Sequence, residues 1–240
     1  MLVEYPQDHI VNKTKPVGDR ISHYGPDENQ VIEFFGEANT GKRIVLIHGG
    51  YWRPTIDRAH LRPLAKALAE RNFKIALIEY RRVQGRPSDY LDDTLDALHS
   101  LKESEMILVG HSAGGHLALL AGREISNCSL ILALSPVADL QRGKELNLGD
   151  GAIQLFLGDK ENAMEKLNPM ALSAARTKIH IMHSEHDFIP LEVAERYYQK
   201  KKAEGADIKF TLVPNADHFT LVDPRSDGLE TLLQALAEIA

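Results

Sequence analysis

Short apolar runs alternate with amphipathic stretches along most of this chain, and the alternation predicts its fold class. The apolar runs are short and rich in β-branched residues, which is typical of buried strands. We predict strands at residues 43–47, 74–78, 106–109, 129–134, 178–183 and 208–213. Between them, apolar residues recur at three- and four-residue steps, as at Leu91, Leu95 and Leu98, which is the spacing of one helix face. We predict helices at residues 57–71, 89–102, 113–125, 191–203 and 225–239.

Apolar strands separated by amphipathic helices favour a mostly parallel central sheet with helices on both faces. The right-handed crossover rule then gives a doubly wound α/β fold. Residues 139–172 interrupt the pattern with several glycines, but they contain too many apolar residues for a disordered linker. We therefore expect a small helical cap at about 139–172, inserted in a single domain that covers residues 1–240.

One motif for a nucleophile lies between a predicted strand and a predicted helix. Residues 110–114 read Gly-His-Ser-Ala-Gly, which has the form G-x-S-x-G. Its glycines permit a sharp turn that lifts the Ser112 hydroxyl above the sheet and places it at a helix N-terminus. The Ala113 N–H would then face the position of an oxyanion.

A serine nucleophile needs a base, and His218 is the candidate among the eleven histidines. It follows the predicted strand at 208–213, so it would lie at the same edge of the sheet as Ser112. His116 lies one turn inside the helix that follows Ser112, so we expect it to pack rather than to accept the proton.

The imidazole in turn needs an acid that fixes its tautomer. Asp187 follows the predicted strand at 178–183. The chain order Ser, Asp, His is the one that accompanies a G-x-S-x-G motif on an α/β sheet. Asp139 follows the preceding strand and stays open as the alternative acid.

A second glycine motif follows the strand at 43–47, where residues 48–52 read His-Gly-Gly-Tyr-Trp. A loop at this position can supply further N–H groups to an oxyanion, because glycine lets the backbone approach the substrate. We predict that Gly50 and Tyr51 donate from this loop, with Ala113 opposite.

The rest of this motif, His48, Gly49 and Trp52, would border the substrate pocket. Trp52 is the only tryptophan in the chain, and two roles stay open for it. It could stack on an aromatic substrate, or it could brace the loop against the protein. Arg81 and Arg82 could bind a substrate carboxylate, or they could form structural ion pairs.

Together these motifs resemble the α/β-hydrolase superfamily, and the resemblance covers nearly the whole chain. The Gly-His-Ser-Ala-Gly-Gly stretch at 110–115 is similar to that of the lipase/esterase branch. Many members carry His-Gly-Gly-Gly in the second motif, whereas this chain has Tyr51 and Trp52 after two glycines. The form at 48–52 resembles that of kynurenine formamidases (arylformamidases) of the serine-hydrolase type.

The resemblance implies an α/β-hydrolase fold and cleavage of N-formylkynurenine to kynurenine and formate, without a cofactor. It implies Ser112 as nucleophile, Asp187 as acid and His218 as base. A short-chain carboxylesterase would use the same residues, so it remains the alternative. A hydrolase-fold binding protein without catalysis is the alternative from another class, and it usually has a damaged triad.

The composition of the chain excludes some classes of binding partner. Lys and Arg number 28 against 34 Asp and Glu, and the net charge of −6 argues against nucleic acid and anionic membrane surfaces. The single cysteine, Cys128, cannot form an internal disulfide, and it is expected in the core. No signal peptide or apolar run of ~20 residues is visible, so we expect a cytoplasmic protein. Its partner would be a small ester or amide, and a homodimer stays open.

A series of histidines and a run of lysines are interpreted as structural rather than functional. His180, His183 and His186 lie three residues apart, and on a strand such residues face opposite sides, so no metal site is expected. Residues 200–202, three lysines at a helix end, are expected to be solvated.

Overall fold

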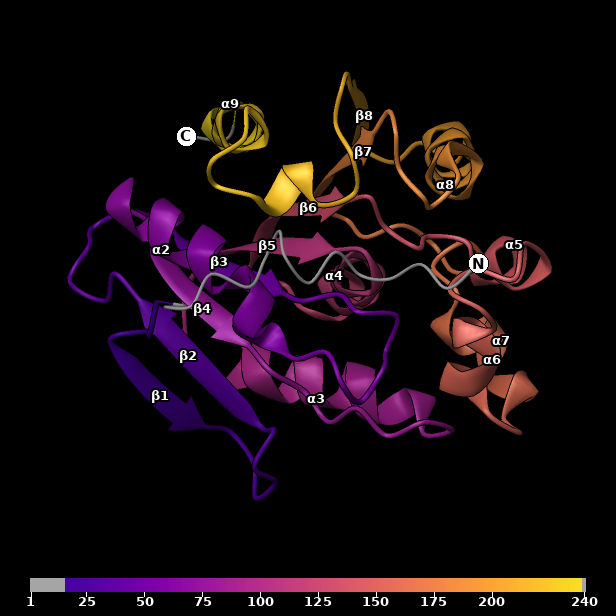
Figure 1. Cartoon of the computed structure of the whole chain (residues 1–240), viewed down its shortest axis with the longest axis horizontal. Helices are drawn as coiled ribbons and strands as arrows, with labels where there is room; N and C mark the ends of the chain where they lie inside the picture. Colours follow the sequence, from indigo (N-terminus) through magenta and orange to yellow (C-terminus); the bar gives the residue numbers. More distant parts are fainter. Residues whose placement is uncertain (1–15, 239–240) are drawn as a thin grey trace.

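The computed structural model describes residues 16–238. In this part of the chain, eight strands form one sheet in the order β1-β2-β4-β3-β5-β6-β7-β8 (Figure 1). The β1–β2 and β2–β4 pairs are antiparallel, and every other pair is parallel. The strands are β1 (Arg20–His23), β2 (Val31–Phe35), β3 (Arg43–Ile47), β4 (Lys74–Ile78), β5 (Met106–His111), β6 (Cys128–Leu134), β7 (Lys178–Ser184) and β8 (Ile208–Val213).

Helices connect the parallel strands and cover the sheet. The longer ones are α2 (Arg62–Glu70), α3 (Pro87–Ser100), α4 (Ala113–Glu124), α8 (Leu191–Ala203) and α9 (Gly228–Ala237). Three short helices, α5 (Leu140–Glu145), α6 (Ala152–Leu157) and α7 (Met164–Leu167), lie in the region expected to form a cap. The 3₁₀ turns are η1 (Arg58–Leu61), η2 (Glu161–Ala163) and η3 (Thr220–Val222).

Residues alternate between the two faces of the sheet, as the period of a strand requires. In β3, Ile44 and Leu46 belong to the apolar cluster under α2 and α9. Val45 and Ile47 belong to the cluster under α3, α4 and α8 on the other face (Figure 1). All four side chains are fully buried. The two helix layers therefore fix the central strands from both sides and position the loops that leave their carboxyl ends.

The predicted α/β-hydrolase fold with its mostly parallel sheet is confirmed, and the six predicted strands are present. The antiparallel strands β1 and β2 were not predicted, because both are short and β2 carries a buried charge, Glu33. Helix α9 begins at Gly228 rather than at residue 225. Before it, the Ser226 hydroxyl donates to the Thr220 and Asp223 carbonyls, and these bonds close a turn in place of a first helical turn.

The expectation that residues 200–202 are solvated is wrong for Lys201. Its side chain is fully buried, and its ammonium group donates to the Leu172 carbonyl and pairs with Glu204. The group therefore binds carbonyls at the end of the cap region, whereas the neighbouring lysines lie on the exposed side of α8.

Candidate active site

The Gly-His-Ser-Ala-Gly motif forms a tight turn between β5 and α4. Ser112 has φ 57° and ψ −120°, a conformation that costs a residue other than glycine about 1–3 kcal/mol. A Cβ on Gly110 would lie 2.2 Å from the Gly114 carbonyl oxygen, and one on Gly114 would lie 2.1 Å from that of Ile47. Both positions therefore require glycine. The Ser112 Oγ is buried and has no hydrogen-bond partner within the described part of the chain.

Asp187 and His218 meet directly, although they follow different strands. Nδ1 of His218 lies 2.8 Å and 2.9 Å from the two carboxylate oxygens of Asp187. Because Nδ1 faces a carboxylate, it carries the proton and leaves Nε2 as a free acceptor. That Nε2 is also buried and unpartnered among residues 16–238.

Further bonds hold the Asp187 carboxylate in its charged form. The Ile189 N–H donates to it at 2.8 Å, and Ser135 adds a side-chain bond. Burial by itself would raise the pKa of Asp187, but the electrostatic interaction with His218 and these hydrogen bonds outweigh burial, and the pKa of Asp187 lies below its usual value. The carboxylate is therefore suited to orient the imidazole of His218.

His111, next to Ser112 in the chain, links the serine turn to the loop of His218. Its Nε2 lies 2.9 Å from the His218 carbonyl oxygen, and the two rings lie 4.5 Å apart. Burial and the nearby His218 hold the pKa of His111 well below its ordinary value, so the ring is neutral and Nε2 donates. Ser112 and His218 are thus joined through His111, and no direct bond joins their side chains in the described structure.

The His-Gly-Gly-Tyr-Trp loop lies directly against the serine turn. A Cβ on Gly49 would lie 2.8 Å from the Cβ of Ser112 and 3.5 Å from the backbone nitrogen of Ala113. The backbone of residues 50–52 has positive φ throughout, at 116°, 52° and 55°. The loop is therefore tightly wound, and the structure brings it to the N-terminus of α4 as the sequence predicts.

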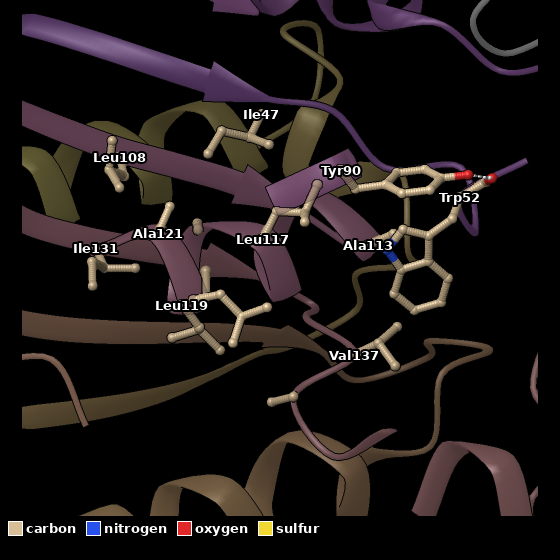
Figure 2. Close-up of a cluster of buried hydrophobic side chains, with 14 of the residues drawn as sticks. Ile47, Trp52, Tyr90, Leu108, Ala113, Leu117, Leu119, Ala121, Ile131 and Val137 are labelled. Atoms are coloured by element: carbon tan, nitrogen blue, oxygen red, sulfur yellow. Dashed lines mark hydrogen bonds between the residues drawn. The ribbon is translucent and has the colours of Figure 1, made fainter. Parts of the chain in front are cut away.

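Trp52 anchors this loop in the protein. Its side chain is 1% exposed, stacks on Phe156 of α6 at 4.5 Å and meets the His116 ring edge-on at 5.2 Å. Figure 2 shows the indole beside Ala113 at the start of α4, with its nitrogen turned toward that helix. These contacts favour the bracing role of Trp52, while its Nε1 is left without a hydrogen-bond partner in the described range.

His48 supports the same loop through buried bonds, which differs from the pocket position expected for it. Its Nδ1 lies 2.7 Å from the Gly49 carbonyl oxygen, and its Nε2 lies 2.8 Å from Oε1 of Glu79. Both ring nitrogens of His48 are therefore held in place by buried oxygen atoms. Glu79 also pairs with Arg82 and accepts the Arg58 N–H at 2.9 Å.

These partners decide the ionisation of Glu79. Burial alone would raise its pKa, but the charges and hydrogen bonds of His48, Arg82 and Arg58 lower the pKa to about 2. We call this group, formed by His48, Glu79, Arg58 and Arg82, the loop-support cluster.

The alternative acid and the packed histidine have structural partners. Asp139 caps α5 and pairs with Nε of Arg196 at 3.1 Å. His116 has Nε2 2.7 Å from the Leu167 carbonyl oxygen and is fully buried, as its position in the helix indicated. Burial lowers the pKa of His116 to about 4, so it is neutral at pH 7.

Both arginines considered for a substrate carboxylate bind carboxylates of the protein. Arg81 holds Asp93 with Nε and Nη2, the latter 2.6 Å from Oδ1. Arg82 belongs to the loop-support cluster. The ion-pair alternative therefore describes both residues.

Across residues 16–238, no group of three or more histidine, cysteine or acidic side chains is placed to hold a metal ion. His180 bonds Thr211, whereas His183 bonds the Ile189 carbonyl, so the two rings have separate partners. Cys128 is buried at the start of β6, as expected. In the same range, no helix is both long and apolar enough to cross a membrane.

Glu79 and Ser135 were missed by the sequence reasoning. Glu79 follows β4 and Ser135 follows β6, each at the carboxyl end of a buried apolar strand. A polar residue at that end of a parallel strand is the signal that could have found them, because ligands of open α/β sheets bind there.

Comparisons with known proteins agree with this geometry. Residues 44–164 match a family model described as the alpha/beta hydrolase family. A kynurenine formamidase from Drosophila melanogaster is 25% identical over 92% of this chain and 82% of its own length. A kynurenine formamidase from Salmo salar is 23% identical over 90% of this chain and 80% of its own. Among solved structures, esterase B from Lactobacillus rhamnosis superposes with a TM-score of 0.80 at 18% identity, covering 95% of this chain and 87% of that one.

Proposed function

Because the chain belongs to the alpha/beta hydrolase family, we propose that Ser112, His218 and Asp187 form a catalytic triad that hydrolyses a small ester or amide. One observation carries the proposal. The Asp187–His218 pair leaves Nε2 bare and buried, and the buried Ser112 Oγ is also bare on a strained turn tied to the same loop. These two atoms are the nucleophile and the base that a Ser-His-Asp triad requires, and the missing bonds leave them available to a substrate.

The proposed reaction proceeds through an acyl-enzyme. Nε2 of His218 takes the Ser112 proton while Oγ attacks the carbonyl carbon, and the carbonyl oxygen becomes an oxyanion. The N–H groups of Gly50, Tyr51 and Ala113 stabilise that charge. His218 then returns the proton to the leaving group as its bond to carbon breaks. Water, deprotonated in turn by His218, attacks the acyl carbon. The bond from that carbon to Oγ then breaks, His218 returns the proton to Oγ, and the acid leaves.

The proposed substrate is an N-formyl aromatic amide, with N-formylkynurenine as the first compound to test. The His-Gly-Gly-Tyr-Trp form and the two relatives named kynurenine formamidase support this choice. A formyl group is the smallest acyl group, and an anilide nitrogen leaves more readily than an alkylamine. A short-chain carboxylesterase is the second candidate, since the same groups would cleave an activated acetate.

Side-by-side hydrolysis of N-formylkynurenine and p-nitrophenyl acetate tests the proposal, with Ser112→Ala as control. A kcat/KM of about 10⁴ M⁻¹s⁻¹ or more on the formyl compound, lost in the variant, would support the formamidase. Turnover of p-nitrophenyl acetate alone would favour the carboxylesterase over the formamidase. If a fluorophosphonate did not label Ser112 stoichiometrically, the proposal of a serine hydrolase would be wrong, and a binding protein without catalysis would be favoured.

A further inference from the structure

We infer that Tyr80 and Tyr90 are positioning residues that hold the oxyanion loop, residues 48–52, in its reactive conformation. The inference rests on the hydrolysis proposed above. The Tyr80 hydroxyl donates to the His48 carbonyl at 2.7 Å, and the Tyr90 hydroxyl donates to the Trp52 carbonyl at 2.8 Å. These are the carbonyls of the first and last residues of the loop, and Figure 2 shows the second bond.

The two tyrosines form one buried unit. Both are 0% exposed, and their rings lie 5.7 Å apart at 55°. Tyr80 also stacks flat on the His48 ring at 4.3 Å, and Tyr90 meets Phe156 at 5.2 Å. We call Tyr80 and Tyr90 the clamp. Tyr80 follows β4 and Tyr90 belongs to α3, so the clamp joins the loop to the sheet and to a helix. Burial raises the pKa of Tyr90, which keeps its hydroxyl protonated as a donor.

The loop needs such a clamp because its backbone is strained. Residues 50–52 all have positive φ, and each of the two that are not glycine costs about 1–3 kcal/mol in such a conformation. Strain of this kind persists only where the surroundings over-determine the backbone. Without tethers at both ends, the loop would relax and turn its N–H groups away from the oxyanion.

The geometry shows how a bond to a carbonyl orients the donors. A peptide unit is planar, so a hydroxyl that fixes the carbonyl of residue 48 also fixes the N–H of residue 49. In the same way, Tyr90 fixes the peptide between Trp52 and Arg53. The Arg53 N–H returns to the Gly50 carbonyl at 3.0 Å and closes the turn. The N–H groups proposed to donate, those of Gly50 and Tyr51, lie between these two fixed planes.

The test compares Tyr80→Phe and Tyr90→Phe, which remove one hydroxyl each and keep the ring. Tyr197→Phe is the matched control, because it removes the hydroxyl of another buried tyrosine, 1% exposed, which belongs to α8. We expect kcat on p-nitrophenyl acetate to fall about tenfold in each clamp variant, with KM within about twofold. The reason is that substrate binding does not require the oxyanion donors, whereas the transition state does.

A second measurement is the affinity for a trifluoromethyl ketone inhibitor, whose adduct with Ser112 would place an oxyanion against the loop. Its affinity should fall in parallel with kcat in Tyr80→Phe and Tyr90→Phe and stay unchanged in Tyr197→Phe. A general loss of packing would lower the melting temperature in all three variants without this split. Values of kcat within twofold of wild type in both clamp variants, or an equal fall in Tyr197→Phe, would overturn the inference.

Amide hydrogen exchange of residues 49–53 separates this inference from the proposed function. Faster exchange in the two clamp variants but not in Tyr197→Phe supports the clamp, even if the wild type shows no Ser112-dependent turnover. Unchanged exchange overturns the clamp, even if Ser112→Ala abolishes activity. If Tyr80→Phe does not fold, Tyr90→Phe decides by the same measurements.

Discussion

Two buried polar groups lie near the carboxyl ends of the central strands, and they differ in how completely they are bonded. The loop-support cluster is saturated, since both nitrogens of His48 and both oxygens of Glu79 have partners. The Asp187–His218 pair is bonded on one side only, because Nε2 of His218 is bare, as is the Ser112 Oγ.

This difference suits the two groups to different roles. A buried donor or acceptor without a partner costs about 1–3 kcal/mol, so a fold retains one where something else repays that cost. The saturated cluster maintains the shape of the oxyanion loop. The half-bonded pair keeps atoms available for a proton and a substrate, which is the basis of the proposed function.

Removal of the proposed nucleophile should have the largest effect on activity. We expect Ser112→Ala to lower kcat/KM on p-nitrophenyl acetate by about 10⁴-fold or more, while the melting temperature stays near that of the wild type. The hydroxyl has no partner in the described structure, so its loss removes no hydrogen bond. Retention of activity with the purified variant would refute the assignment of Ser112.

The two aspartates considered as the acid give the next largest contrast. Asp187→Asn should lower kcat by about 10⁴-fold, because an amide no longer selects the tautomer of His218. Asp139→Asn should leave kcat within about twofold and lower only stability, since Asp139 binds Arg196 and caps α5. Steady-state kinetics and urea unfolding of both variants measure this. The reverse pattern would make Asp139 the acid.

Glu79→Gln tests the saturated cluster through stability. It leaves His48 and Arg82 without their carboxylate, and we expect a loss of about 3–5 kcal/mol in the free energy of unfolding at pH 7. Urea unfolding measures the loss, with the exposed Glu185→Gln as control. A change below about 1 kcal/mol would show that the cluster is not the support described here.

The same carboxylate predicts a dependence of stability on pH. The pKa of Glu79 is about 2 in the folded protein and 4.5 otherwise, so the charged form is favoured by folding. Its contribution is fully present above about pH 4.5 and is lost as the pH falls through that range toward 2. Between pH 4.5 and 3, the variant Glu79→Gln should therefore lose less stability than the wild type.

The smallest effect concerns His116, a buried imidazole that is neutral at pH 7. Its pKa is about 4 in the folded protein against 6.5 otherwise, so the unfolded chain binds a proton first as the pH falls. Its stabilising contribution is present above pH 6.5, and about 2 kcal/mol of it is lost by pH 5. His116→Gln should reduce the loss of stability between pH 7 and 5 by that amount, whereas the exposed His99→Gln should not change it.

The central sheet and the residues of the candidate site were predictable because both depend on local patterns. Apolar runs fixed β3 to β8, and two glycine motifs and the chain order identified Ser112, Asp187 and His218. The supporting residues were not predictable. Tyr80, Tyr90 and Glu79 act through contacts between segments far apart in sequence, and no local pattern distinguishes a tyrosine that binds a carbonyl from one that only packs.

The positions of the site residues along the chain also govern when the site comes into existence. The oxyanion loop and Ser112 follow β3 and β5, whereas Asp187 and His218 follow β7 and β8, near the carboxyl end of the chain. Strands β3 to β6 can pair before β8 is available, but in the proposed triad the serine gains its base only when β8 docks beside β7. On that proposal, a growing or refolding chain carries an inert serine until β8 is in place. Recovery of turnover after dilution from denaturant would time that docking step, later than the recovery of helical signal from the central layers.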